Sequence, residues 1–435
     1  MHLPTDDLTP KTLAAKLEPY FSGDVHTTSA FEPMLAAARE QLEAYNPDKY
    51  ASSRGYVDGN VSRLNPYITW GVFSLREVAE TLLPKAHGKD RQKFLNELGW
   101  KAYFREAFLV LGDEVYESLE PYKYPTREKS DTLPEDIAAG QTGLACMDEI
   151  VRELKETGYL HNHKRLWFAA YLEHFRNVAW QQGEALFYRY LIDGEPGPNA
   201  LSWQWVASTF AHKPYYFNHE NMTRYGHTPC PDVPFNASYD ALSQRYFGGY
   251  GKGGYVERPD AQPESDGDVP CPNLLRPPGE NPLVLLHAER LSDRAEALKA
   301  APDAPVLVVL DGERLKQEQP SFMRLHWAVS LAADVVRLLH EQGRDAELHL
   351  VESVEEVAGV VLDKNAQSIV TSESWHPGTW MFLDRLDQSL PVSVIEDGLR
   401  FKAAAPLRSF SSFWRKAEPQ VKRGLEVYSG FTKRR

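Results

Sequence analysis

The sequence is poor in cysteine and has no long apolar run. Its three cysteines, Cys146, Cys230 and Cys271, lie far apart and form no CxxC motif. We therefore expect neither a disulfide framework nor an iron–sulfur cluster, and such sparse cysteine suits a reducing cytoplasm. No stretch approaches 18 consecutive apolar residues, and the first residues lack the pattern of a secretion signal. These absences predict a cytoplasmic protein without a membrane partner.

Positive charge is also scarce. The formal net charge is −13, which argues against a surface that coats DNA, because phosphate binding depends on clustered Lys and Arg. One such cluster exists, in a basic tail over residues 401–435. A bare charge run is more often solvated than bound to nucleic acid, but an acidic protein can still present one positive face. The charge alone leaves DNA binding open.

The first half of the chain has the hydrophobic period of helices. After an N-terminal extension over residues 1–27, the spacing of apolar residues predicts an all-helical domain over 28–245. Individual helices are predicted over 31–45, 91–111, 142–157 and 163–182, and the last three end at Gly112, Gly158 and Gly183.

The second half changes character. Residues 246–282 are rich in Gly and Pro and predict a linker. After it, residues 283–400 alternate short apolar runs (PLVLLHA, APVLVVLD, AELHLV, QSIVTSE and LPVSVIE) with helical segments such as 322–342. That alternation is typical of a parallel-sheet α/β domain, although no GxGxxG turn marks a dinucleotide site in it.

One block carries a specific resemblance. Residues 140–218 include GQTGLACMDEIVRELKETGYLHNHKRL and, further on, WQQGEALFYRYLIDGEPGPNALSWQW. This block resembles the flavin-binding core of the photolyase/cryptochrome family, which reads GxTGxxxxDAxMRxLxxTGWMHNRxRM and WxxGExYFxxxLIDGDxxxNxxxWQW. Upstream, DGNVSRLNPYITWGVFSLRE and NELGWKAYF resemble two further family segments in the expected order. The resemblance implies FAD as the cofactor, bound by a photolyase-type helical domain.

The α/β domain resembles the same family in reversed order. VLLHAERLSDRAEALKAAPDAPVLVVLD is similar to the domain that normally precedes the helices, and SFSSFWRKA to the segment that normally leaves that domain. Here both come last. The resemblance implies a circular permutation, with the helical FAD-binding domain first and a Rossmann-like α/β domain last. We expect a monomer, although no motif decides the oligomeric state.

The resemblance also implies the residues that contact FAD. Ser62, Arg63, Leu64 and Asn65 would hold its phosphates, because hydroxyl, amide and guanidinium groups are what a diphosphate needs. Arg165 and Asp193 would flank the isoalloxazine, and Asn199 would face its N5. The full set expected to bind the cofactor is Tyr50, Ser62, Arg63, Leu64, Asn65, Phe94, Glu97, Lys101, Asn162, Arg165, Asp193, Glu195 and Asn199.

Other matched positions imply electron transfer and handling of damaged DNA. Trp203 and Trp180 match the first two tryptophans of the family's photoreduction chain, whereas the third falls on Arg127, so Tyr122 or Tyr124 is left as a substitute. The expected catalytic residues are Glu97, Asn162, Trp100 and Trp205, and the expected substrate contacts are Trp100, His163, Leu166 and Trp205. His163 stands where the family has Arg, which weakens one phosphate contact.

The leading hypothesis is a light-driven lyase that splits cyclobutane pyrimidine dimers in UV-damaged DNA. The alternatives are a cryptochrome-like photoreceptor without repair activity and a dark redox or structural flavoprotein. No motif identifies a second, antenna chromophore. The triplet His161-Asn162-His163 is a weak metal motif, because no carboxylate or cysteine stands at ligand spacing, and we expect no metal there.

Overall fold

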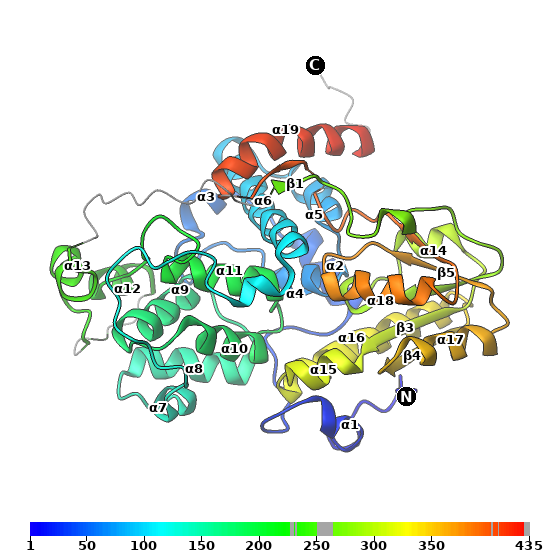
Figure 1. Ribbon diagram of the computed structural model, residues 1–435, viewed down its shortest axis with the longest axis horizontal. Helices are drawn as coiled ribbons and strands as arrows, with labels where there is room; N and C mark the ends of the chain where they lie inside the picture. The colour runs from blue at the N-terminus through cyan, green and yellow to red at the C-terminus, as the bar shows by residue number, and fades with distance from the viewer. Residues whose placement is uncertain (227–229, 231–232, 250–263, 402, 408, 430–435) are drawn as a thin grey trace.

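The computed structural model describes residues 1–226, 230, 233–249, 264–401, 403–407 and 409–429, which form a helical part and an α/β part (Figure 1). Every regular element described between residues 28 and 245 is a helix, which confirms the predicted all-helical domain. The main helices are α2 (Leu35–Ala44), α3 (Tyr50–Ser53), α4 (Asn65–Thr69), α5 (Leu75–Leu82), α6 (Gly88–Leu111), α7 (Glu135–Ala139), α8 (Ala145–Thr157), α9 (Asn162–Ala170), α10 (Trp180–Tyr190), α11 (Pro196–Ala207), α12 (His219–Gly226) and α13 (Tyr239–Phe247). Within the described ranges, no helix is long and apolar enough to cross a membrane.

The α/β part is built on a parallel five-stranded sheet, as predicted. Its strand order is β4-β3-β2-β5-β6, with bounds β2 (Pro282–Leu286), β3 (Val306–Asp311), β4 (Ala346–Val351), β5 (Ser368–Ser372) and β6 (Val392–Ile395). The connecting helices are α14 (Glu296–Ala300), α15 (Gly312–Glu318), α16 (Phe322–Glu341), α17 (Val354–Asp363) and α18 (Pro377–Asp387). All five predicted apolar runs form strands, because strands buried on both faces read as continuous hydrophobic segments.

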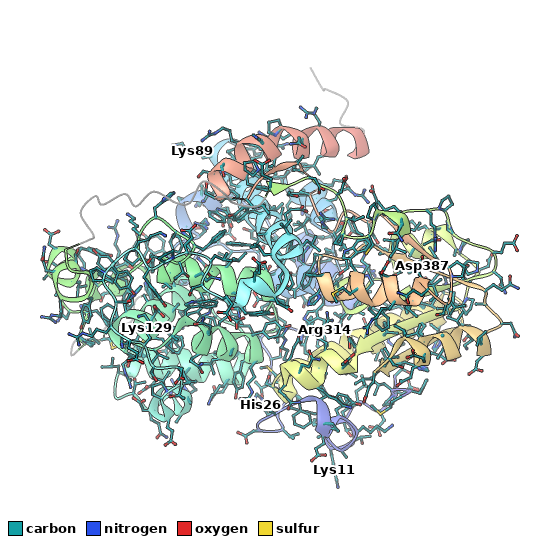
Figure 2. All side chains as sticks on the ribbon, in the orientation of Figure 1. Lys11, His26, Lys89, Lys129, Arg314 and Asp387 are labelled. Carbon is teal, nitrogen blue, oxygen red and sulfur yellow. A yellow bond between two sulfur atoms is a disulfide. The ribbon has the colours of Figure 1, made fainter. Side chains whose placement is uncertain are left out.

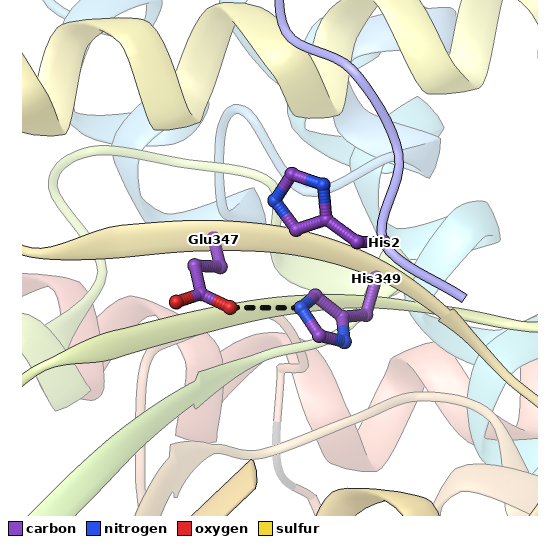
Figure 3. A group of neighbouring side chains, drawn as sticks. All are labelled: His2, Glu347 and His349. Atoms are coloured by element: carbon purple, nitrogen blue, oxygen red, sulfur yellow. Dashed lines mark hydrogen bonds and ion pairs between the residues drawn. The ribbon is translucent and has the colours of Figure 1, made fainter. Parts of the chain in front are cut away.

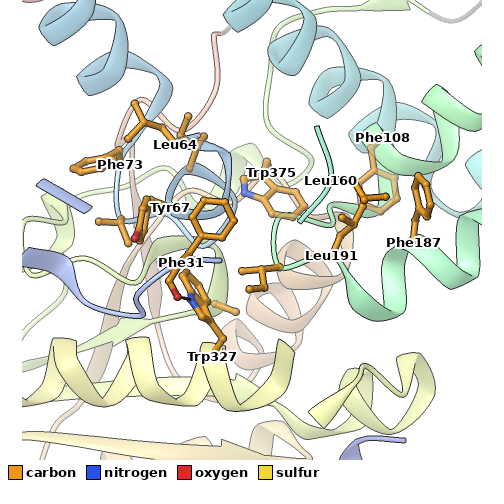
Figure 4. Packing of buried hydrophobic residues seen from close by; sticks show 14 of the residues in the cluster. Phe31, Leu64, Tyr67, Phe73, Phe108, Leu160, Phe187, Leu191, Trp327 and Trp375 are labelled. Atoms are coloured by element: carbon orange, nitrogen blue, oxygen red, sulfur yellow. Dashed lines mark hydrogen bonds between the residues drawn. The ribbon is translucent and has the colours of Figure 1, made fainter. Parts of the chain in front are cut away.

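Alternate strand residues feed two hydrophobic clusters. Leu283 and Leu285 pack with α17 and α18 in a smaller cluster on one face of the sheet. Val284 and Leu286 belong to the main cluster, which also holds α16 and the helical part. Figure 4 shows this shared core at Trp327 of α16, whose indole N–H donates to the carbonyl of Phe31 at 3.1 Å. One continuous core therefore joins the two parts.

Both ends of the chain cross from one part of the fold to the other. Helix α1 (Pro10–Leu17) lies against the α/β part, whereas α19 (Phe410–Ser429) lies across α6 in the helical part (Figure 1). A short antiparallel pair, β1 (Glu264–Ser265) with β7 (Ala405–Pro406), precedes α19. Residues 250–263 of the predicted linker, and 402, 408 and 430–435 of the predicted tail, lie outside the described residues.

The helix predicted over 163–182 is wrong in its middle. Helix α9 ends at Ala170, a π-helical turn follows over Tyr171–Phe175, and α10 starts only at Trp180. Here the backbone pairs with a distant segment: the N–H of Ser130 donates to Asn177 O at 3.0 Å, and the N–H of Ala179 donates to Ser130 O at 2.8 Å. Asn177 takes a left-handed φ of 54°, which Asn tolerates better than most residues. Periodicity along one segment cannot reveal a break made by another.

Gly183 does not end a helix but lies inside α10. A Cβ there would come within 2.1 Å of the Trp203 ring. We expect Gly183→Ala to lower the free energy of unfolding by about 1–3 kcal/mol, because the packed indole has to move. The matched control is Gly359→Ala in α17, where a Cβ meets no atom within 4 Å; it should stabilise by up to about 1 kcal/mol. Urea unfolding of both variants checks the pair, and equal effects would contradict the packing argument.

The expectation of unpaired cysteines is also wrong. Cys146 of α8 and Cys230 form a disulfide, with their Cα atoms 5.9 Å apart, and Cys271 is free. The two partners are 84 residues apart in sequence, so no local motif announces the bond. The cysteine content consequently gives no support to a reducing compartment.

Candidate functional site

Two adjoining cavities lie in the helical part and share a wall made by Asn65, Asn162, Arg165 and Asp193. The first, of about 210 Å³, is lined mostly by α6, α9, α10 and α11, with Phe104, Leu166, Phe187 and Trp203 among its residues; we call it the apolar cavity. The second, of about 300 Å³, is lined by Tyr50, Arg54, Val61, Ser62, Arg63, Leu64, Glu97, Tyr159, Leu160 and His161 besides the shared wall; we call it the polar cavity.

The loop before α4 contributes the side chains of Ser62 and Arg63 to the polar cavity. The Arg63 side chain lies over the Tyr159 ring at 4.5 Å and the Phe31 ring at 5.2 Å, a cation–π arrangement. Arg63 also has a left-handed φ of 53°. The loop is held from outside by Gln41, whose amide donates to the Ser62 carbonyl at 2.7 Å. A serine hydroxyl and a guanidinium thus face one cavity from a loop that is fixed from both sides.

The shared wall centres on an ion pair. The Nη2 atom of Arg165 lies 2.9 Å from both carboxylate oxygens of Asp193. The Nε atom of Arg165 donates to the Leu160 carbonyl at 2.9 Å. The Asn65 amide donates a third hydrogen bond to Asp193, at 2.7 Å from Oδ2. A buried carboxylate therefore fixes one cation and one amide between the two cavities. Such a cation can stabilise negative charge on a bound ring.

A second buried cluster, formed by Lys101, Arg105 and Glu195, contributes to the wall of the apolar cavity. Glu195 Oε1 lies 2.7 Å from both Lys101 Nζ and Arg105 Nη2. Burial acts to raise the pKa of Glu195, but the charges of Arg105 and Lys101 outweigh it and lower the pKa to about 2. Burial lowers the pKa of Lys101 to about 8, and its ammonium donates to Asn65 Oδ1 at 2.6 Å. The carboxylate of Glu195 thus holds Lys101 against the residues of the shared wall.

Asn199 is oriented by Glu184. Its amide nitrogen donates to the Glu184 carbonyl at 2.9 Å and to the carboxyl Oε1 at 2.7 Å. Burial raises the pKa of Glu184 to about 7, and the Asn199 amide opposes that rise. Because both N–H donors are engaged, the carbonyl oxygen is the group that Asn199 can offer to the apolar cavity. That arrangement suits acceptance of a hydrogen bond from a ring N–H.

Both predicted electron-transfer residues are buried, and one of them lines the apolar cavity. Trp203 lines it and meets Phe187 edge to face, with centroids 5.0 Å apart. Trp180 is buried at the start of α10, where its indole N–H donates to Ser118 at 3.1 Å. The position that matches the family's third tryptophan, Arg127, is exposed. The substitutes left open, Tyr122 and Tyr124, contact each other with ring centroids 5.7 Å apart.

Three residues predicted to hold damaged DNA, Asn162, Glu97 and Leu166, line the cavities. Asn162 is on the shared wall, and Glu97 lines the polar cavity, where its carboxylate lies 2.8 Å from Arg54 Nη2 and 2.7 Å from Lys93 Nζ. Leu166 lines the apolar cavity. Phe94 is buried behind Tyr50, with ring centroids 5.3 Å apart.

Other predicted substrate residues do not line either cavity. Trp100 stacks on Phe410 of α19, with ring centroids 3.9 Å apart. Trp205 is 38% exposed and packs on Tyr215. His163 binds the Gly55 carbonyl through Nδ1 and stacks on Trp167. The structure therefore brings most of the expected FAD contacts to the two cavities, whereas Trp100 and Trp205, the expected aromatic contacts of the substrate, lie outside them.

Tyr159, Arg105 and His161 are site residues that the motif comparison did not assign. Tyr159 and His161 lie inside the family-like block of residues 140–218. Their position close to assigned residues was the signal by which the sequence could have identified them. Burial lowers the pKa of His161 to about 4, so its ring is neutral. Its Nε2 is buried and has no hydrogen-bond partner among the described residues. A polar ligand in the adjoining cavity would satisfy that atom.

These residues fit FAD. The apolar cavity offers aromatic and aliphatic walls with amide and charged groups at its edge, and the polar cavity offers Ser62, Arg63 and the unsatisfied His161 nitrogen. Between the helical and α/β parts, by contrast, Thr69, Glu289, Arg314 and Trp375 help to line a cavity of only about 40 Å³ (Arg314 is labelled in Figure 2). That volume holds only a few water molecules.

Comparison with known proteins agrees with this chemistry. A sequence profile of the FAD binding domain of DNA photolyase matches residues 94–239. The chain is 28% identical over 219 residues to a deoxyribodipyrimidine photo-lyase of Halobacterium salinarum, covering 48% of this chain and 44% of that protein. It is 31% identical over 228 residues to that of Salmonella typhimurium, covering 50% and 48%. The chain thus spans about half the length of the curated relatives it matches.

Solved structures of the same kind align over about half of each chain. A cryptochrome of Synechocystis matches with a TM-score of 0.41 and 23% identity, covering 47% of this chain and 46% of that one. An archaeal photolyase of Sulfolobus tokodaii, solved with two FAD molecules, matches with a TM-score of 0.37 and 21% identity, covering 52% and 58%.

Proposed function

Because this chain belongs, through its helical FAD-binding part, to the photolyase/cryptochrome family, we propose that it is a light-driven lyase for cyclobutane pyrimidine dimers in UV-damaged DNA. When bound, FAD supplies the electron that opens the two carbon–carbon bonds of the dimer, and the electron returns afterwards with no net redox change. The chain's own residues bind and orient the cofactor and the damaged bases.

The observation that carries the proposal is the position of Asn162 and Glu97. Asn162 lies on the wall shared by the two cavities, and Glu97 lines the polar cavity. Amide and carboxyl groups hydrogen-bond to the carbonyl and N–H edges of pyrimidines, and a base must leave the duplex to reach them. Their joint presence at the cavities favours a lesion as the ligand.

The surroundings supply further contacts for DNA. Trp205 presents an exposed aromatic face on which an extruded base can stack. Arg415, Lys416, Lys422 and Arg423 are exposed on α19, beside the Phe410–Trp100 stack, and cations in such a row suit a phosphate backbone. Trp100 becomes available to a base only if Phe410 moves off its ring.

The test is repair by the photoreduced protein. We would reduce the FAD-loaded protein anaerobically, add an oligonucleotide with one thymine dimer, and measure thymine recovery under blue light and in darkness. We expect light-dependent recovery that falls at least about tenfold in Glu97→Ala, because a hydrogen bond to a charged group is lost. The control is Glu149→Ala, a half-exposed carboxylate on α8, which should repair like the wild type.

A photoreceptor without repair activity is the second candidate. It is favoured by the Phe410 ring that covers Trp100 and by the exposed Arg127 at the third position of the photoreduction chain. Full FAD occupancy and photoreduction without thymine recovery would support it and would contradict the lyase. A chain that binds no FAD would contradict both.

We also infer that the chain is circularly permuted relative to the family. Two contacts support this: residues 1–3 pair with the sheet of the α/β part, and Trp414 of α19 donates to Asn96 of α6 at 2.9 Å. Each end of the chain is thereby tied to the part that lies further away in sequence. A permuted gene with the α/β part first should yield a protein that still loads FAD.

A further inference from the structure

The first residues of the chain extend one edge of the parallel sheet. His2 forms an antiparallel bridge with His349 of β4, the edge strand. The N–H of Leu3 donates to the Leu348 carbonyl at 2.9 Å, and a matching bond of 2.9 Å closes the other side of the bridge. Because these bonds flank the bridge, His2 and His349 form a non-hydrogen-bonded pair, in which opposite side chains come closest.

Glu347 completes a three-residue cluster on the same face. It stands two residues before His349 on β4, and side chains two apart on a strand point the same way. Its Oε2 lies 2.9 Å from Nε2 of His349, and the two imidazole rings meet edge to face with centroids 5.2 Å apart. One possible ligand atom from each of the three residues lies within 4.8 Å of the others (Figure 3).

Two imidazole nitrogens and one carboxylate oxygen are a ligand set for borderline divalent metals. Zn²⁺ takes His and Glu ligands with metal–ligand distances of about 2.0–2.2 Å, and three protein ligands leave its fourth position open. We propose that His2, Glu347 and His349 bind a divalent transition-metal ion, best matched by Zn²⁺, which clamps the amino-terminal residues to the edge of the sheet. The site is separate from the two cavities and does not depend on FAD.

Two positive charges lie near the cluster, the Lys364 ammonium and the Met1 amino group, and each has an acidic partner outside the cluster. Lys364 lies 2.5 Å from Glu347 Oε1, which leaves Oε2 for the metal, and it has a second partner in Asp345 at 2.8 Å. Ligation requires the ionised carboxylate of Glu347 and the neutral imidazole of His349. On binding, Nε2 gives up its hydrogen bond to Glu347, and the imidazole keeps its proton on Nδ1.

The test is isothermal titration calorimetry. Zn²⁺ is titrated into chelator-treated protein that spans residues 1–435 and carries no histidine tag. We expect one equivalent to bind, and His2→Ala and His349→Ala each to weaken the affinity at least about tenfold. Co²⁺ in place of Zn²⁺ should give the visible absorption of a four-coordinate site. The matched control is His87→Ala, which removes an exposed histidine just before α6 and should bind Zn²⁺ like the wild type.

Hydrogen exchange gives an independent readout. Zn²⁺ should slow exchange of the Leu3 amide in the wild type and leave it unchanged in His2→Ala, whose substitution at the chain end spares the core. If the wild type shows no saturable binding, or if His87→Ala loses as much affinity as His2→Ala, the cluster is a hydrogen-bonded edge contact only and the proposal fails. Loss of FAD or of repair activity has no bearing on either outcome.

Discussion

Replacing Glu195 with alanine is expected to lower the free energy of unfolding by about 3–5 kcal/mol, because it leaves a buried arginine without its counter-charge. Arg105 is fully buried, and it donates to Glu195 through Nε at 3.0 Å and through Nη2 at 2.7 Å. Its remaining contacts, the carbonyls of Leu399 and Ile68, carry no net charge. Urea unfolding followed by circular dichroism measures the loss.

A double variant distinguishes the loss of the ion pair itself from the cost of leaving one buried charge without a partner. Arg105→Met with Glu195→Leu removes both charges and refills the space with apolar groups, so its loss should be smaller than the sum of the two single losses. Additive losses, or a loss under about 1 kcal/mol in Glu195→Ala, would contradict a coupled buried pair.

The same carboxyl predicts an acid transition. Burial acts to raise the pKa of Glu195, but Arg105 and Lys101 lower it from 4.5 to about 2. The folded state therefore binds this proton less readily than the unfolded state. The stabilisation is fully present above pH 4.5 and is lost as the pH falls towards 2, an amount on the order of 3 kcal/mol. Glu195→Gln should lack this part of the pH dependence.

The fold was largely predictable because its signals are local. Buried parallel strands appear as short apolar runs, and AELHLV forms strand β4 over its full length. Gly112 and Gly158 end α6 and α8 with positive φ angles, as their places after apolar periods predicted. The predictions that failed depended on distant partners: Ser130 pairs with Asn177 and Ala179 between α9 and α10, and Cys230 is bonded to Cys146 across 84 residues.

The candidate site likewise contains residues whose placement was predictable from the sequence and residues whose placement was not. Asn162, Arg165 and Asp193 share one gap-free block of motif, and the structure brings them to one wall. Trp100 belongs to a matched motif too, yet its ring is covered by Phe410, 310 residues further along the chain. A motif gives the chemistry of a position, whereas its access to a ligand depends on which segments pack over it.

Replacing Trp203 with phenylalanine is expected to slow photoreduction of bound FAD at least about tenfold while FAD still binds. Trp203 is the tryptophan that lines the apolar cavity, and phenylalanine keeps an aromatic wall but gives up an electron far less readily than indole. The measurement is the bleaching of the flavin absorption under blue light with an external reductant.

Trp167→Phe is the matched control for this route, because Trp167 is equally buried in the helical part, donates its indole N–H to Asn221 at 3.1 Å, and lines neither cavity. It should photoreduce like the wild type. Trp180→Phe then tests whether Trp180 is the next electron donor after Trp203. Photoreduction slowed as much as in Trp203→Phe would place Trp180 on the electron-transfer route, whereas photoreduction at the wild-type rate would show that the electrons do not pass through it. Photoreduction of Trp203→Phe at the wild-type rate would remove Trp203 from the route and leave its indole a packing role against Gly183.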